Sequence, residues 1–213
     1  MKHQVNQEWL ISFNELFGNN ASFERVSAFL LTEVVTFQRE QAIRYLEHIK
    51  QLHAKEFGQY RDFFGDWIMS QKIKLDANFD QVLTPYPIVD FMSLSACHEL
   101  QEQFKGQTIQ FIDPFCGTGR FMLGIAAACI TSGIRDKKIY CVDIDQRMVA
   151  YCITNALLHK VDCHIILGDV LDFRIDRAWC VQGGKISELL DFEHLYDVIG
   201  REPKEVLKQR DLI

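Results

Sequence analysis

A glycine-rich segment directly after a short apolar run is the feature that most constrains the fold of this chain. Residues 109–121 read Ile-Gln-Phe-Ile-Asp-Pro-Phe-Cys-Gly-Thr-Gly-Arg-Phe. The apolar run predicts a strand, and Gly117 and Gly119 predict a tight turn that leaves room for a ligand. The residues that follow favour a helix. A strand, a glycine turn and a helix in this order are typical of nucleotide-binding α/β folds.

Asp113, at the tip of the expected strand, indicates which kind of ligand the turn would suit. A dinucleotide-binding turn holds a pyrophosphate and needs a third small residue, where this chain has Met122. The carboxylate of Asp113 would also repel a phosphate. S-adenosylmethionine has no phosphate and carries a sulfonium and an ammonium group, both of which a carboxylate attracts. The turn therefore predicts an S-adenosylmethionine site.

Strands and helices are expected to alternate along the second half of the chain. The expected strands are 109–113, 138–143, 163–167 and 195–199, and the expected helices are about 119–132, 146–159 and 202–211. Residues 179–184 are expected to form a loop. Such an alternation predicts parallel strands joined by crossover connections. We therefore expect an α/β fold, a partial Rossmann-like core with strand order 3-2-1-4 and the fourth strand at an open edge.

The region before this core has a different pattern. From residue 1 to about residue 75, aromatic and aliphatic residues recur at helical spacing and predict a packed helical bundle. We therefore divide the chain into a helical N-terminal domain at 1–76 and a core domain at 77–213. The seven cysteines form no C-x-x-C pair, which predicts buried reduced thiols and no metal site.

Two further acids follow the next two expected strands. Asp143 could accept hydrogen bonds from both hydroxyls of a ribose, and Ile144 could pack on an adenine ring. Asp169 could accept from the adenine amino group, with Val170 against the ring. Each acid taken alone also fits a helix cap or a solvated loop. Acids at three successive strand ends, one of them beside a glycine turn, together predict a nucleoside site.

These motifs resemble the S-adenosylmethionine-dependent N6-adenine DNA methyltransferases, in the subgroup that includes the type I restriction-modification subunits. In that family a Thr-Pro segment, here Thr84-Pro85, precedes the Asp-Pro-Phe-x-Gly-x-Gly turn, and a helical domain precedes the core. The resemblance covers about 80–200 and implies a partial Rossmann-like methyltransferase core with S-adenosylmethionine as the cofactor. The cofactor-binding residues that it implies are Thr84, Pro85, Asp113, Phe115, Cys116, Gly117, Gly119, Asp143, Ile144, Asp169 and Val170.

The family's catalytic motif, Asn or Asp followed by two prolines and an aromatic residue, is degenerate in this chain. Counted from the strand expected at 195–199, Glu202 takes the place of the Asn or Asp and Pro203 matches the first proline. Lys204 and Glu205 replace the second proline and the aromatic residue that stacks on an extruded base. From the same resemblance we expect the family's remaining core strands and target-recognition region to be absent. The resemblance therefore implies cofactor binding without independent N6-adenine transfer.

Two other functions stay open: an active methyltransferase on another substrate, and a non-enzymatic protein-interaction module. The net charge of −6 disfavours free-standing DNA binding, so contact with DNA would depend on a partner subunit. An open sheet edge predicts a homo-oligomer or a partner protein, unless a helix or loop of the chain covers it. No apolar run has the length of a membrane span and the N-terminus is polar, so we expect a cytoplasmic protein without membrane contact.

Overall fold

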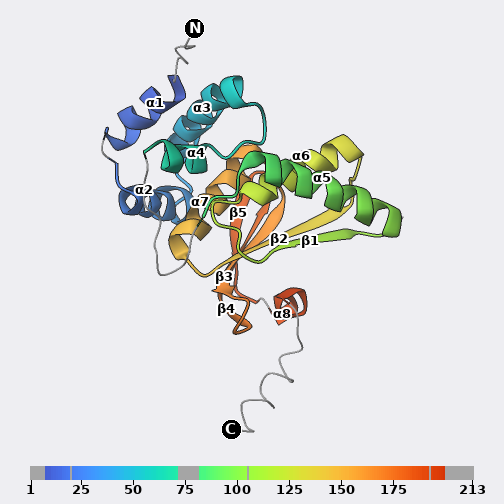
Figure 1. Ribbon diagram of the computed structural model, residues 1–213. Coiled ribbons are helices and arrows are strands. Elements are labelled where there is room, and N and C mark those ends of the chain that lie inside the picture. The colour runs from blue at the N-terminus through green and yellow to red at the C-terminus, as the bar shows by residue number, and fades with distance from the viewer. Residues whose placement is uncertain (1–7, 20, 72–81, 105, 192, 200–213) are drawn as a thin grey trace.

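Within the described residues, the sheet of this protein has five strands and lies against helices from both halves of the chain (Figure 1). The computed structural model describes residues 8–19, 21–71, 82–104, 106–191 and 193–199. The strands are β1 (Ile109–Asp113), β2 (Lys137–Asp143), β3 (Cys163–Asp169), β4 (Arg174–Gln182) and β5 (Lys185–Leu189). They lie side by side in the order β1-β2-β3-β4-β5.

The helices of the first half of the chain precede the sheet, and those of the second half connect its strands or follow them. They are α1 (Glu8–Phe17), α2 (Phe23–Phe29), the π-helix η1 (Leu30–Thr36), α3 (Glu40–Phe57), α4 (Phe63–Ser70), α5 (Tyr86–Gln103), α6 (Arg120–Ser132), α7 (Gln146–His159) and α8 (Glu193–Ile199). None of these described helices is both long and apolar enough to cross a lipid bilayer.

The first three strands form the parallel unit that the sequence predicts. β1 pairs in parallel with β2, and β2 pairs in parallel with β3. α6 connects β1 to β2, and α7 connects β2 to β3. The expected α/β fold class is confirmed, because a parallel sheet alternates with helices along this part of the chain.

The prediction of a fourth strand at 195–199 is wrong, because these residues belong to helix α8. Leu195 and Ile199 are spaced by one helical turn, and both are buried in a small cluster with Tyr140 and Ile166 of the sheet. The apolar residues of this short segment fit the two-residue spacing of a strand and the 3.6-residue spacing of a helix equally well. Burial of the face that carries Leu195 and Ile199 favours the helix. The expected order 3-2-1-4 is not found: within the described part of the chain, β1 pairs with β2 alone and forms an edge of the sheet.

The loop expected at 179–184 is also wrong, because it holds the end of β4 and the turn of a hairpin. β4 pairs antiparallel with both β3 and β5. Gly183 and Gly184 have φ of +56° and +73°, the left-handed backbone that a two-residue hairpin turn between twisted strands requires. A Gly-Gly pair between two alternating segments was the sequence signal for this hairpin.

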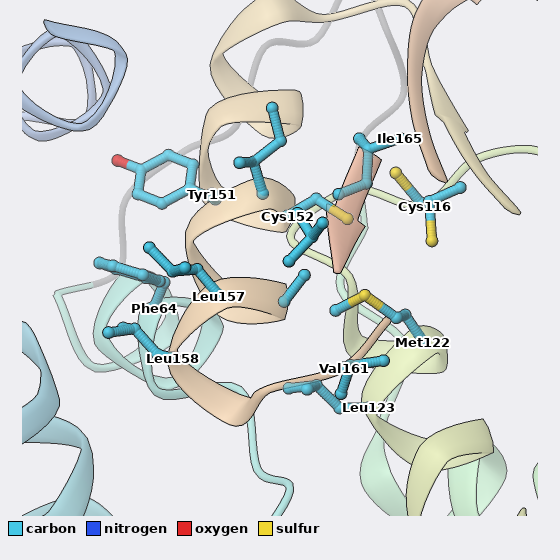
Figure 2. Packing of buried hydrophobic residues seen from close by; sticks show 14 of the residues in the cluster. Phe64, Cys116, Met122, Leu123, Tyr151, Cys152, Leu157, Leu158, Val161 and Ile165 are labelled. Atoms are coloured by element: carbon cyan, nitrogen blue, oxygen red, sulfur yellow. The ribbon is translucent and has the colours of Figure 1, made fainter. Parts of the chain in front are cut away.

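The N-terminal helices share one hydrophobic core with the sheet. α7 contacts α2, η1 and α3 as well as β2 and β3. Tyr151 on α7 stacks on Phe23 of α2 and donates a hydrogen bond to the carbonyl of Phe23 at 3.0 Å. Figure 2 shows Tyr151 and Phe64 on one side of α7 and Cys152 on the side of Ile165 in β3. The domain boundary predicted at 76 lies outside the described residues and stays a prediction.

Candidate functional site

The parallel strands bring the three predicted acids to the same side of the sheet, at the carboxyl ends of the strands. Asp113 and Asp143 end β1 and β2, and Asp169 ends β3. The strand register places Asp113 beside Cys141 and Asp143 beside Leu167, so each acid lies two residues further along than the one before. The acids therefore form a stepped row at the carboxyl ends of the strands, where ligands bind in open α/β folds.

The glycine turn (Cys116–Gly119) is attached to the end of β2. The backbone N–H of Cys116 donates to the carbonyl of Val142 at 2.8 Å, and that of Gly117 donates to Asp143 Oδ2 at 2.8 Å. Gly117 and Gly119 have φ of +52° and +88°, which disfavours any residue with a Cβ. A Cβ on Gly119 would lie 2.9 Å from Cys152 Sγ, whereas one on Gly117 would meet nothing within 4 Å. Gly119 is thus needed for packing, and Gly117 borders open space.

The carboxylate of Asp143 accepts hydrogen bonds from the backbone and can still accept one from a ligand. Its Oδ2 accepts from Gly117, and its Oδ1 accepts from the N–H of Asp145 at 2.9 Å. Its burial raises the pKa of this carboxyl above the ordinary value. A carboxylate offers about four acceptor positions, so Asp143 can still accept from a ribose hydroxyl. The neighbouring Asp145 caps α7 by accepting from the N–H of Arg147 at 2.8 Å.

Asp113 has a carboxylate oxygen that no described residue satisfies. Its Oδ1 accepts from the N–H of Phe115 at 3.3 Å, whereas its Oδ2 is enclosed and has no hydrogen-bond partner among the residues that the structure describes. Burial raises the pKa of this carboxyl to about 7. An unpaired buried acceptor is costly and uncommon, and its presence indicates a partner from outside the chain. The ammonium or sulfonium group of S-adenosylmethionine fits this position.

Large apolar side chains are exposed beside the acids. Phe115 follows β1, Ile144 follows β2 and Leu171 follows β3, with exposed fractions of 69%, 42% and 77%. Val170, the adenine wall implied by the resemblance, is half-buried against the cluster under α8. Leu171, which the sequence prediction missed, is more exposed than Val170 and therefore more available to an adenine ring. The apolar pair directly after an acid at a strand end was the signal for it.

Asp169 orders the loop after β3. Its Oδ1 accepts from the N–H of Leu171 at 2.9 Å and from that of Asp172 at 3.4 Å. These contacts correspond to the turn role that an acid at a strand end can have on its own. The loop holds Leu171 at the same sheet edge as Ile144, because β2 and β3 are parallel neighbours. Asp169 therefore shapes the predicted adenine side of the site.

Thr84 and Pro85 lie at the start of α5 and are connected to the glycine turn through Arg120. The carbonyl of Thr84 accepts from Arg120 Nη1 at 3.0 Å, and Arg120 directly follows Gly119. Arg120 is 4% exposed and pairs with Asp62 and Asp66 from the N-terminal half. The sequence prediction missed this arginine, although a single charge within an otherwise apolar helix was a signal for it.

Cys116 is a packing residue rather than a nucleophile. Its side chain is buried with the thiols of Cys141 and Cys152, and Figure 2 shows it on the same side of α7 as Cys152. The contact with Cys141 is the largest of the effects that raise the pKa of the Cys116 thiol. All seven cysteines are free thiols in this structure, and the expected burial is confirmed for six of them.

A cavity of about 360 Å³ lies against β1, which is an edge strand of the sheet within the described residues. Side chains from α5, β1 and α6 line it, and most of them are apolar, including Met92, Ile112 and Phe121. Asp113 borders the cavity at the site end of the strand. Among the described strands, β1 and β5 form the two edges of the sheet, and neither is the strand expected at 195–199.

The catalytic candidates Glu202 and Pro203 lie outside the described residues. Their assignment was counted from a strand at 195–199, where the structure has helix α8. Their roles stay predictions.

Three parallel strands with a glycine turn after the first strand and acids at successive strand ends define a Rossmann-like methyltransferase fold. Residues 95–213 match the RMKL-like methyltransferase domain family, and the chain belongs to that family. Membership of a methyltransferase family implies S-adenosylmethionine as the cofactor, as the turn predicts. The N6-adenine DNA acceptor implied by the resemblance stays a prediction.

One solved structure matches the chain. It is a crystal structure described as a candidate class I S-adenosylmethionine-dependent methyltransferase from Listeria monocytogenes, with 15% identity and a TM-score of 0.46. The match covers 75% of this chain and 51% of that one, so the chain spans about half the length of the solved protein. No curated protein matches the chain.

Proposed function

We propose that this chain binds S-adenosylmethionine at the carboxyl ends of β1, β2 and β3, and that it is an N6-adenine DNA methyltransferase-like protein that does not transfer methyl groups by itself. The observation that carries the proposal is the enclosed Oδ2 of Asp113, which has no partner within the described residues. An acceptor in that state suits a cationic ligand, and the ammonium and sulfonium groups distinguish this cofactor from a dinucleotide.

Each part of the site has a role in this proposal. Asp113 and the Thr84 segment would hold the methionine end, and Asp143 would accept from the ribose hydroxyls. Ile144 and Leu171 would cover the adenine ring, because they are exposed apolar side chains at neighbouring strand ends. When bound, S-adenosylmethionine supplies an electrophilic methyl group on its sulfonium.

The absence of independent transfer is proposed from the sequence around 199–205. Transfer to an adenine amino group needs acceptors for its hydrogens and an aromatic side chain that stacks on the base. The chain offers Glu202 and Pro203 followed by Lys204 and Glu205, with no aromatic residue at that place. The preceding segment is α8, not the strand that carries the motif in the family it resembles.

The proposed function also requires a partner chain. The net charge of −6 gives weak attraction for the phosphates that dominate DNA affinity. The edge of β1 and its apolar cavity would receive another polypeptide, with Ile112 47% exposed there. The opposite edge is partly covered, because Gln38 Nε2 donates to the carbonyl of Ile186 in β5 at 2.9 Å. The polypeptide at the edge of β1 would be a second copy or a partner protein. Contact with DNA would come from a partner subunit, because a second copy has the same net charge of −6.

Calorimetric titration of S-adenosylmethionine, with S-adenosylhomocysteine alongside, tests the first part of the proposal. We expect saturable micromolar binding of both, and no binding at millimolar ligand would overturn the assigned site and favour a protein-interaction module. Labelled methyl transfer to DNA, RNA and small amines tests the second part. We expect no transfer by the chain alone. Transfer to DNA would contradict the loss of catalysis, and transfer to another acceptor would contradict the DNA assignment.

A further inference from the structure

A buried carboxylate, Asp62, joins the N-terminal helices to the glycine turn. Asp62 is fully buried at the start of α4, where its Oδ1 accepts from the N–H of Gly65 at 2.9 Å. The same oxygen accepts from Asn155 Nδ2 of α7 at 2.8 Å. Its Oδ2 accepts from the hydroxyl of Thr118 at 2.5 Å. One side chain therefore connects α4, α7 and the centre of the turn.

Thr118 is held through both its side chain and its main chain. It is fully buried and lies between Gly117 and Gly119, two residues with little conformational restriction of their own. Its hydroxyl donates to Asp62, and its carbonyl accepts from Asn155 Nδ2 at 2.8 Å. These contacts replace the rigidity that the glycines lack, so the conformation of the turn depends on residues far away in the sequence.

Arg120 extends the same network to the second part of the site. Its Nε donates to Asp62 Oδ2 at 3.3 Å, and its Nη2 donates to Asp66 Oδ1 at 3.1 Å. Its Nη1 donates to the carbonyl of Thr84 at 3.0 Å. The guanidinium also lies 4.3 Å from the centre of the Tyr86 ring on α5. The glycine turn and the Thr84 segment are thus joined by one side chain whose acidic partners come from the N-terminal half.

The physical cost of such a network argues for a role beyond stability. Buried ion pairs lose the solvation of both charges, and packed apolar residues of similar volume often serve a core as well or better. Hydrogen bonds are directional, whereas apolar contacts are not, so a polar network can fix the orientation of a backbone segment. Here the bonds from Asp62 and Arg120 end on the turn and on Thr84, the two segments assigned to the cofactor.

We propose that Asp62, Thr118 and Arg120 are positioning residues that hold the glycine turn and Thr84 in the geometry that binds S-adenosylmethionine. The N-terminal helices are then a part of the cofactor site, although the family match begins at residue 95. This inference rests on the proposed function, because it assigns a cause to the affinity of the same site.

Thr118→Val tests the inference, because it removes the hydroxyl and keeps the volume of the side chain. Thr118→Ser is the conservative variant that keeps the hydroxyl. Tyr151→Phe is the matched control, since it removes a different buried hydrogen bond of 3.0 Å between the N-terminal helices and α7. Each variant of the whole chain is measured for S-adenosylmethionine affinity, thermal stability and amide hydrogen exchange at residues 116–119.

We expect Thr118→Val to weaken affinity about tenfold, the loss typical of one buried hydrogen bond to a charged group. Faster exchange of the turn amides should accompany this loss, and Thr118→Ser should restore both properties. Tyr151→Phe should lower thermal stability and leave affinity and exchange unchanged. Equal affinity and exchange in Thr118→Val and the parent, or equal losses in Thr118→Val and Tyr151→Phe, would overturn the inference.

Hydrogen exchange also separates this inference from the proposed function. If the parent fails to bind S-adenosylmethionine, the proposed function fails and the assignment to this cofactor fails with it. Faster exchange at 116–119 in ligand-free Thr118→Val, but not in Tyr151→Phe, would still support positioning of the turn. If the parent binds the cofactor and exchange at 116–119 is the same in Thr118→Val as in the parent, the positioning role alone is overturned.

Discussion

Asp143 Oδ2 accepts a hydrogen bond from the backbone N–H of Gly117 at 2.8 Å, which joins the end of β2 to the turn after β1. The residue predicted to hold the ribose thereby also fixes the turn predicted to approach the cofactor. The two functional segments are one structural unit, because the carboxylate that would contact the ligand is also a backbone acceptor. Loss of this side chain should affect the site in both ways.

Asp143→Ala should weaken S-adenosylmethionine binding by about 1–3 kcal/mol, because the ribose hydroxyls and the Gly117 N–H both lose an acceptor. Calorimetric titration measures this loss. The matched control is Asp162→Ala: Asp162 Oδ1 accepts from the N–H of Gly183, another glycine with positive φ, at 2.9 Å in the hairpin turn. The control should keep the affinity of the parent. Unchanged affinity in Asp143→Ala would remove the ribose assignment.

Affinity for S-adenosylmethionine should rise with pH through about 7, the pKa to which burial raises Asp113. A cationic ligand prefers the ionised carboxylate, so binding is weaker below that pKa and stronger above it. The ionised fraction rises about tenfold from pH 6 to pH 8, which sets the upper limit of the change in affinity. Titrations across this range should show the rise in the parent and a flat profile in Asp113→Asn.

The Asp113 carboxyl also predicts how stability depends on pH. Stability should fall as pH rises, whereas affinity should increase. A folded-state pKa raised above the unfolded value contributes stability at low pH that is lost as pH rises through about 7. The ligand-free parent should therefore lose thermal stability relative to Asp113→Asn between pH 6 and pH 8. If the melting temperatures of the two proteins changed equally with pH, Asp113 would ionise without a cost in stability. That result would contradict the enclosure of its carboxylate.

Gly119→Ala and Gly117→Ala should separate packing from ligand approach. The new Cβ at position 119 would lie 2.9 Å from Cys152 Sγ and adopt φ of +88°, so it should destabilise the fold by about 2–4 kcal/mol. At position 117 the Cβ meets nothing within 4 Å, and the cost of about 1–2 kcal/mol comes from the left-handed backbone alone. Thermal unfolding measures the difference, and equal destabilisation would contradict the packing role of Gly119.

Ile112→Lys should prevent association at the edge of β1. Ile112 is 47% exposed on that strand and lines the cavity, and a lysine on an edge strand disfavours pairing with another chain. Light scattering should show an assembly in the parent and a monomer in this variant, at equal thermal stability. Ile11→Lys is the control, because Ile11 is 57% exposed on α1. A monomeric parent that captures no other polypeptide would contradict the proposed edge contact.

Segments with a strong local pattern were predicted within one or two residues. The strand at 109–113, the turn at Gly117 and Gly119, and the helix at 146–159 all appear where expected. The pattern was weaker at 195–199, where five residues fit a strand or a helix equally well. Packing of Leu195 and Ile199 against the sheet selected the helix. The hairpin of β4 and β5 was missed although its Gly-Gly turn was visible.

The sequence by itself determined which backbone segments could turn tightly and which strand ends would carry acids, because these properties depend on single residues and their immediate neighbours. Only the tertiary structure decided which polar groups would be paired. It placed Asp62 against Thr118 and Arg120, more than fifty positions away, and left Asp113 Oδ2 without a partner in the described part of the chain. Desolvation and hydrogen bonding depend on which surfaces meet, and that is settled by the packing of the N-terminal helices against α7 and the sheet.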